Sequence, residues 1–198
     1  VRHAVASRFD LGELGEYRLR SPLDRRHVVS SICKRLKSVS EGRKNLLVEN
    51  LLDLCQVEIP DGLGSKVLLS WDEAKEMAEG GIDFGAHSVT HPILTKMPAE
   101  EAKCEIKKSK EEIEKRLGMR VSSFAYPDGS LSPEIVRFVE EAGFQGAVTL
   151  RASWIGPKSN PYLLGRIGTT EDLNQLRLML CGFWGDMHRI LCALKNER

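Results

Sequence analysis

Apolar residues recur along this chain of 198 residues with a spacing that changes near residue 70. Before that point, residues 24–39 and 45–55 place apolar side chains three and four positions apart, which is typical of amphipathic helices. The segment "IPDGLGSK" at residues 59–66 marks a turn. We therefore expect the first part of the chain to consist of two helices that cover another part of the molecule.

From Ser70 onward, short apolar segments alternate with amphipathic helices. Most of these helices begin with serine or proline and end at glycine, the residues that favour helix starts and stops. The expected helices are residues 71–79, 98–118, 132–143 and 169–180. The expected strands are residues 82–87, 121–127, 144–149 and, less regularly, 162–168. This alternation predicts an α/β fold with a parallel sheet.

Composition narrows the classes of partner. The chain has 29 Lys and Arg residues and 28 Asp and Glu residues, so its net charge does not attract a polyanion. Nucleic acid is therefore not expected as a ligand. No apolar run approaches the roughly 20 residues of a membrane-spanning helix. The five cysteines lack CxxC spacing and are odd in number, which argues against a disulfide framework. Without a signal-like segment after Val1, the sequence does not indicate a compartment.

Two histidines, His87 and His91, lie four residues apart at the end of an expected strand. Imidazoles at this spacing can converge on one ion, with Zn–N distances of about 2.0–2.1 Å. Pro92 disfavours a helix at His91, and Ser88 replaces the glutamate of the helical HExxH motif. The pair therefore predicts a metal site on a loop at the carboxyl edge of the sheet, where functional side chains of parallel sheets gather.

Two longer segments contain these and other candidate residues: "FGAHSVTHPILTKM" at residues 84–97 and "SSFAYPDGSLSPEIVRFVEEAGFQGAVT" at residues 122–149. The first is similar to the His-Ser/Thr-x-x-His-Pro motif of the polysaccharide deacetylases, a carbohydrate esterase family with the NodB-homology fold. The second resembles that family's next motif, in the subgroup with Phe-x-Tyr-Pro. The resemblance runs from about Leu68 to Gly168 and implies an incomplete (β/α) barrel, a distorted TIM-like barrel.

The resemblance implies an activity and a cofactor. Members are metal-dependent hydrolases that remove acetyl groups from a polysaccharide or acetylated sugar, breaking a carbon–nitrogen bond that is not a peptide bond. His87 and His91 would bind the divalent metal, usually zinc, and Ser88 would orient their loop through a hydrogen bond. The implied partner is an acetylated carbohydrate, and the implied location is the cell envelope or the extracellular space.

The resemblance also implies roles for further residues. The backbone N–H of Asp128 would stabilise the oxyanion that forms during acyl hydrolysis, and Arg166 would contact a carboxylate of the complete site. An Asp before Gly129 is also typical of a plain turn, which is an alternative interpretation of this position. The remaining implied substrate contacts are Tyr126, Pro127 and Trp154.

The sequence departs from the family pattern in two places. The family's Thr-Phe-Asp-Asp-Gly motif, which supplies the third metal ligand and the general base, has no counterpart here. "SRFDLGELG", around Asp10, offers a single carboxylate, and we do not expect it to substitute. The family's late Leu-x-x-His motif is absent between Leu163 and Leu180, and His188 is interpreted as an ordinary exposed histidine.

These departures shape the expected organisation. Residues 1–198 are expected to form a single deacetylase-like domain without its first strands, and this chain alone is expected to be inactive. Residues 1–67 resemble a helical insertion, and residues 68–180 would form the barrel core. Two alternatives stay open: a noncatalytic remnant or carbohydrate-binding module that uses the same groove, and an unrelated structural α/β domain whose histidines cap a loop.

Overall fold

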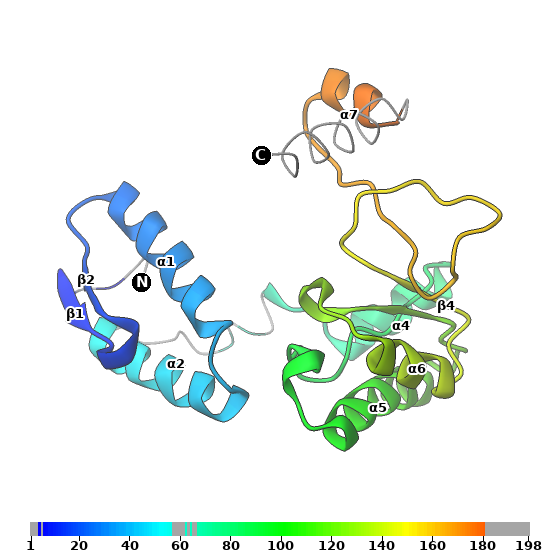
Figure 1. The fold of residues 1–198 in the computed structure, drawn as a ribbon, viewed down its shortest axis with the longest axis horizontal. Coiled ribbons are helices and arrows are strands. Elements are labelled where there is room, and N and C mark those ends of the chain that lie inside the picture. The colour runs from blue at the N-terminus through cyan, green and yellow to red at the C-terminus, as the bar shows by residue number, and fades with distance from the viewer. Residues whose placement is uncertain (1–3, 5, 57–61, 63, 65–66, 181–198) are drawn as a thin grey trace, which may run out of the picture. The chain divides into compact units, whose positions relative to one another are not determined.

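The computed structural model describes residues 4, 6–56, 62, 64 and 67–180. The chain divides into two compact units, Val1–Ser70 and Trp71–Arg198, each with its own hydrophobic core (Figure 1). This division lies close to residue 68, where the sequence predicts the start of the barrel core. That the two units form a single domain stays a prediction.

The first unit combines a small β-hairpin with two helices. Strands β1 (Arg8–Asp10) and β2 (Glu16–Arg18) pair antiparallel, and a 3-10 turn at Gly12–Leu14 connects them. Helices α1 (Pro22–Leu36) and α2 (Glu41–Cys55) confirm the two helices predicted from the apolar spacing. The sequence did not indicate the hairpin, because strands of three residues are too short to show a period of two.

Helix α1 begins with a capping box. The Ser21 hydroxyl accepts a hydrogen bond from the Asp24 backbone N–H, and the Asp24 carboxylate accepts one from the Ser21 N–H, so both otherwise unpaired donors are satisfied. Val28 and Ile32, four residues apart, are buried on the inner face of this helix. The capping box and the apolar spacing together define α1 as a helix of the first core.

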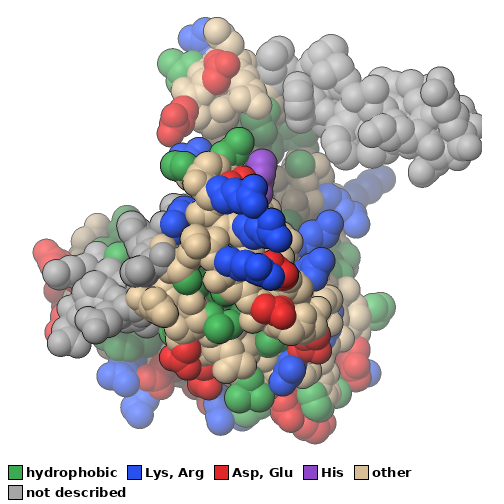
Figure 2. All heavy atoms as spheres, turned by 90° about the vertical axis from the view of Figure 1, so that its left-hand side faces the viewer, with side chains coloured by type: hydrophobic (Ala, Val, Ile, Leu, Met, Phe, Trp, Pro, Cys, Tyr) green, Lys and Arg blue, Asp and Glu red, His purple; other side chains and the backbone are tan. Residues whose placement is uncertain are grey.

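Charge is unevenly distributed despite the net charge of +1. Helix α1 has four Lys and Arg residues and a single acidic residue, Asp24. Figure 2 shows several Lys and Arg side chains grouped on the face that it presents. A balanced total therefore does not exclude a locally basic surface, and the expectation that nucleic acid is not a partner stays a prediction.

The second unit has the predicted alternation of helices and parallel strands. Strands β3 (Ser123–Ala125) and β4 (Gly146–Val148) pair in parallel, with Phe124 opposite Ala147. Single parallel bridges from Ala86 to Phe124 and from Leu164 to Val148 extend the ladder on both sides, so the expected strands at 82–87 and 162–168 are reduced to one bridge each. The elements are α4 (Trp71–Glu79), a 3-10 turn (Leu94–Lys96), α5 (Ala99–Leu117), β3 (Ser123–Ala125), a 3-10 turn (Pro127–Gly129), α6 (Pro133–Glu141), β4 (Gly146–Val148) and α7 (Leu173–Leu180).

Helices α5 and α6 pack together with the strands around one core. The Phe124 ring lies 5.5 Å from that of Tyr126 and 5.3 Å from that of Phe144, measured between centroids. The Lys103 ammonium, from α5, pairs with the Glu141 carboxylate of α6 at 2.7 Å. None of the described helices combines the length and apolar character needed to cross a membrane.

Candidate functional site

The predicted site residues follow the parallel strands at one edge of the ladder. His87 comes directly after the bridge at Ala86, and Tyr126 comes directly after β3. Arg166 lies two residues beyond the bridge at Leu164. Parallel strands end at the same edge of a sheet, so these loops gather there. The structure thus brings together the segments that the sequence placed at the carboxyl edge.

His87 is held by a backbone carbonyl. Its Nδ1 lies 2.6 Å from the oxygen of Ala125, the last residue of β3. A carbonyl oxygen only accepts, so in the neutral imidazole Nδ1 carries the proton and Nε2 keeps its lone pair. A hydrogen bond of this kind on one ring nitrogen is the usual companion of metal binding by the other.

His91 places its ring beside that of His87. The two ring centroids are 4.8 Å apart and the planes lie at 77°, with both side chains exposed. Within the described residues, no group of three or more His, Cys, Asp or Glu side chains is placed to hold a metal ion. The two imidazoles therefore fit part of a zinc site, two of the usual three protein ligands.

The loop between the histidines has an unusual backbone. Ser88 has φ of 60° and His91 has φ of 58°, in the left-handed region that residues with a Cβ rarely adopt. The Ser88 hydroxyl accepts a hydrogen bond from the His91 backbone N–H at 3.1 Å, and its role in orienting the two imidazoles stays a prediction. Such a conformation needs support from surrounding contacts.

Glu105 of α5 supplies much of that support. Its carboxylate accepts hydrogen bonds from the backbone N–H groups of Val89 and Thr90 and from the Thr90 hydroxyl. The sequence did not indicate this residue, because α5 contains many carboxylates and a bond to backbone N–H groups leaves no pattern in the sequence. Glu105 is thus the functional candidate that sequence reasoning missed.

Asp128 forms a tight turn with Gly129. Both residues have positive φ, 55° and 66°, and the Ser130 N–H bonds to the Pro127 carbonyl at 3.3 Å, as in a type I′ turn. The Ser130 hydroxyl also lies 2.6 Å from that of Thr95, which links this turn to the chain after the histidines. The turn interpretation of Asp128 fits this geometry, and its role as an oxyanion donor stays a prediction.

Tyr126 and Pro127, expected to contact substrate, are both fully buried. The Tyr126 hydroxyl donates to the Tyr162 carbonyl at 3.0 Å, and the Tyr162 hydroxyl donates to the Phe144 carbonyl at 3.0 Å. Buried side chains bonded within the protein pack the core and do not line an open surface, so this geometry does not support the expected contacts. Trp154, by contrast, is 54% exposed on the loop after β4.

Burial, and secondarily the neighbouring Tyr162, raises the pKa of Tyr126 from 10.0 to about 12. Folding favours the protonated phenol, so stability is unaffected below pH 10 and falls as the pH rises from 10 toward 12, by up to roughly 3 kcal/mol. In an ultraviolet titration, one of the three tyrosines is expected to ionise late. Tyr126→Phe should remove that late step, and a late step that survives in this variant would contradict the assignment.

Arg166 is tied to the end of β4. Its Nε donates to the Thr149 carbonyl at 2.9 Å, and its backbone N–H donates to the Arg151 carbonyl at 3.0 Å. The preceding Gly165 allows this close approach, because a Cβ there would lie 2.6 Å from the Ser153 carbonyl oxygen. The guanidinium is therefore positioned at the same edge as the histidines, and its contact with a carboxylate stays a prediction.

Asp10 and His188 are the residues compared above with the two family motifs that the sequence lacks. Asp10 lies in β1 of the first unit, where its Oδ1 accepts a hydrogen bond from the Gly12 N–H at 2.9 Å. This hydrogen bond places the Asp10 carboxylate in a local turn of the first unit, and the expectation that it does not substitute for the acidic pair stays a prediction. His188 lies outside the described residues.

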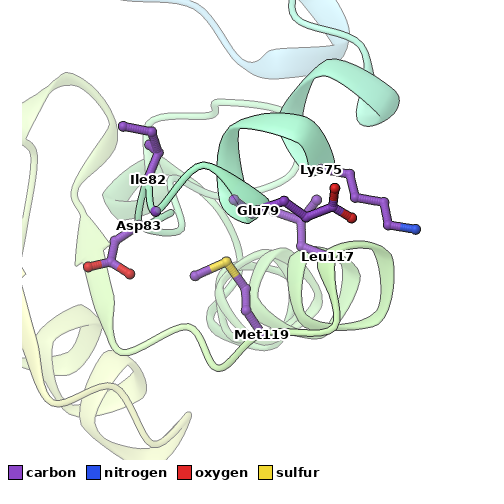
Figure 3. Close-up of a pocket in the computed structure, with 8 residues that line it drawn as sticks. Lys75, Glu79, Ile82, Asp83, Leu117 and Met119 are labelled. Carbon is purple, nitrogen blue, oxygen red and sulfur yellow. The ribbon is translucent and has the colours of Figure 1, made fainter.

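A hollow of about 340 Å³ lies away from the histidines, between the end of α4 and the end of α5 (Figure 3). None of the predicted site residues lines it, and it adjoins the chain before Ala86, at the opposite end of the strand from His87. This hollow therefore does not belong to the candidate metal site. Its lining residues are Lys75, Ala78, Glu79, Gly81, Ile82, Asp83, Leu117 and Met119.

Comparison with known proteins identifies the family. The family model described as polysaccharide deacetylase matches residues 54–147, just under half of the chain, which include both histidines and the segment from β3 into β4. This segment is similar to the polysaccharide deacetylase family. The recognition based on the histidine motif and the Phe-x-Tyr-Pro segment is confirmed.

Individual relatives agree. Over 116 residues, 59% of this chain, it is 26% identical to YxkH of Bacillus subtilis (strain 168), whose name assigns it provisionally to the polysaccharide deacetylases. The Streptococcus pyogenes deacetylase PplD, solved in complex with acetate, is 25% identical, with 60% of this chain covered and a TM-score of 0.54. The chain has the α/β fold of this family, so the predicted incomplete (β/α) barrel is confirmed.

Coverage limits what these relatives imply. The chain spans 42% of the length of YxkH and 55% of the PplD chain. The activity of a whole deacetylase is therefore a proposal for this chain.

Proposed function

We propose that the second unit carries the histidine half of a metal-dependent deacetylase site, which removes acetyl groups from an acetylated carbohydrate. The observation that carries this proposal is the hydrogen bond from His87 Nδ1 to the Ala125 carbonyl, 2.6 Å long. It leaves His87 Nε2 with a lone pair, and the His91 ring lies 4.8 Å away between centroids, in a segment that the polysaccharide deacetylase family model matches.

Each residue at this edge has a distinct task. When bound, a divalent metal such as zinc would polarise the acyl oxygen and lower the pKa of a water molecule toward about 7. His87 and His91 hold that ion. The Asp128 N–H, on the turn after β3, donates to the oxyanion that develops on the former carbonyl oxygen. The Arg166 guanidinium, at the same edge of the sheet, orients a carboxylate of the complete site.

Two imidazoles supply neither a third ligand nor a general base. Within the described residues, no third His, Cys, Asp or Glu joins the two histidines in a group that could hold a metal ion, so the proposal covers the histidine half of the site. On the substrate side, the exposed Trp154 offers its ring to a sugar face, since an aromatic ring combines an apolar face with a polar edge.

A noncatalytic sugar-binding role is the second candidate. The absence of a three-member ligand group among the described residues favours it, because a groove that binds sugar needs no metal. The two candidates differ in one measurable property: the deacetylase site binds a divalent ion through its histidines, and the binding module does not.

Zinc titration by calorimetry tests the proposal. The chain is expected to bind zinc weakly, and His91→Ala should weaken binding by more than the roughly 10–100-fold that loss of a residue orienting a ligand costs. His27→Ala, which removes an exposed histidine from α1, is the matched control and should bind like the unmodified chain. Equal affinities for all three proteins would refute the metal site and favour the binding module.

A further inference from the structure

One carboxylate of α5 bridges the segment between the two histidines. Glu105 Oε2 accepts hydrogen bonds from the backbone N–H groups of Val89 at 2.8 Å and Thr90 at 2.9 Å. Its Oε1 accepts a third from the Thr90 hydroxyl at 3.0 Å. Hydrogen bonds to an ionised acceptor are roughly twice as strong as those between neutral groups, so this is a strong attachment for an exposed loop.

The attachment lies where the backbone most needs it. Val89 and Thr90 are flanked by Ser88 and His91, the two residues of this loop in the left-handed region. Between these two positions, the backbone N–H groups of Val89 and Thr90 point toward α5, where the Glu105 carboxylate accepts their hydrogen bonds. Without an acceptor, these groups would turn to water, and the chain could return to an extended backbone.

Helix α5 provides a fixed base for this carboxylate. Ala102, Ile106 and Ser109, three positions before and one and four positions after Glu105, are buried in the core of the second unit. Glu105 itself is half-buried at the border of that face. The loop is therefore tied to the core from two sides: through Glu105 to α5, and through His87 and the Ala125 carbonyl to β3.

We propose that Glu105 is a positioning residue for the metal site: it fixes the loop so that both imidazoles are presented together before an ion arrives. This inference rests on the proposed metal-binding role of His87 and His91. A loop that is already ordered loses less conformational freedom when the ion binds, and this raises the affinity. Glu105 does not touch the ion; it acts through the 89–90 backbone.

The test compares four variants of the whole chain. Glu105→Ala removes all three hydrogen bonds. Glu105→Gln removes the charge but keeps an oxygen for both N–H groups and an amide that can donate to the Thr90 hydroxyl. Thr90→Val removes the hydroxyl bond alone. Glu101→Ala, an exposed carboxylate one helical turn earlier, removes the same charge from α5 and is the matched control.

Two readouts are needed: the hydrogen-exchange rates of the Val89 and Thr90 amides in the metal-free chain, measured by NMR, and the zinc affinity by calorimetry. Glu105→Ala is expected to accelerate exchange about tenfold or more. It should also weaken zinc binding by roughly 10–100-fold. Glu105→Gln should retain most of both properties, Thr90→Val should show a smaller loss, and Glu101→Ala should match the unmodified chain.

The outcomes separate this inference from the proposed function. If Glu105→Ala keeps slow exchange at both amides, or if exchange accelerates while zinc affinity equals that of Glu101→Ala, the positioning role is overturned. If the unmodified chain binds no zinc, the metal site fails, and with it the presentation of ligands by Glu105. The exchange rates would then show whether Glu105 still orders the loop as a purely structural contact.

Discussion

With zinc present, this chain is expected to release acetate from an N-acetylated oligosaccharide at least ~100-fold more slowly than a deacetylase that has a complete set of ligands and a base. A positioned general base alone contributes about 10²–10⁴-fold, and within the described residues no third His, Cys, Asp or Glu joins His87 and His91 in a potential metal group. The incomplete ligand set should lower the rate further. Acetate release, followed by an enzyme-coupled assay, measures this directly.

The control for this assay is His27→Ala, which removes an exposed histidine from α1 and should leave the low rate unchanged. The opposite result would be informative: turnover close to that of a complete deacetylase, lost in His91→Ala. It would show that a carboxylate within this chain acts as the base. The search would then begin with carboxylates at the edge that carries Asp128 and Arg166.

Replacing Phe124 with alanine is expected to reduce the free energy of unfolding of the second unit by about 3–5 kcal/mol. Phe124 is 1% exposed, and its ring contacts two other aromatic rings in the core that β3, α5 and α6 share. Removing it leaves a cavity beneath the strand that precedes the Asp128 turn. Urea unfolding, followed by near-ultraviolet circular dichroism, gives the change.

Ile155→Ala is the matched control for Phe124→Ala. Ile155 is also apolar and belongs to the same unit, but it is 57% exposed on the loop after β4. Its replacement should change stability by no more than about 0.5 kcal/mol. A comparable loss in both variants would mean that Phe124 does not lie in a close-packed core.

The sequence predicted those features that depend on neighbouring residues. Serine caps, prolines in first turns and the spacing of apolar residues predicted the helices α1, α5 and α6 because helix formation is local. The His87 to His91 spacing, followed by a proline, likewise pointed to a loop with two adjacent imidazoles. These are signals within a few residues of one another.

The features that the sequence did not predict depend on residues that are distant in the chain. Whether residues 82–87 and 162–168 form strands is decided by pairing across the sheet, and each segment retains a single bridge. Burial of Tyr126 results from packing between elements and not from its position after β3. Glu105 bonds backbone groups that every residue has, so no residue pattern could reveal it.

The two attachments of the histidine loop differ in how they tolerate mutation. The acceptor for His87 is a main-chain carbonyl, which any residue at position 125 would supply as long as β3 keeps its path. The acceptor at position 105 is a side chain, and most substitutions remove it. As substitutions accumulate in such a chain, the 88–91 backbone should lose its left-handed conformation first. The proton on His87 Nδ1 should be kept longer, because its acceptor is a main-chain carbonyl. A related protein could thus keep both histidines and still bind metal poorly.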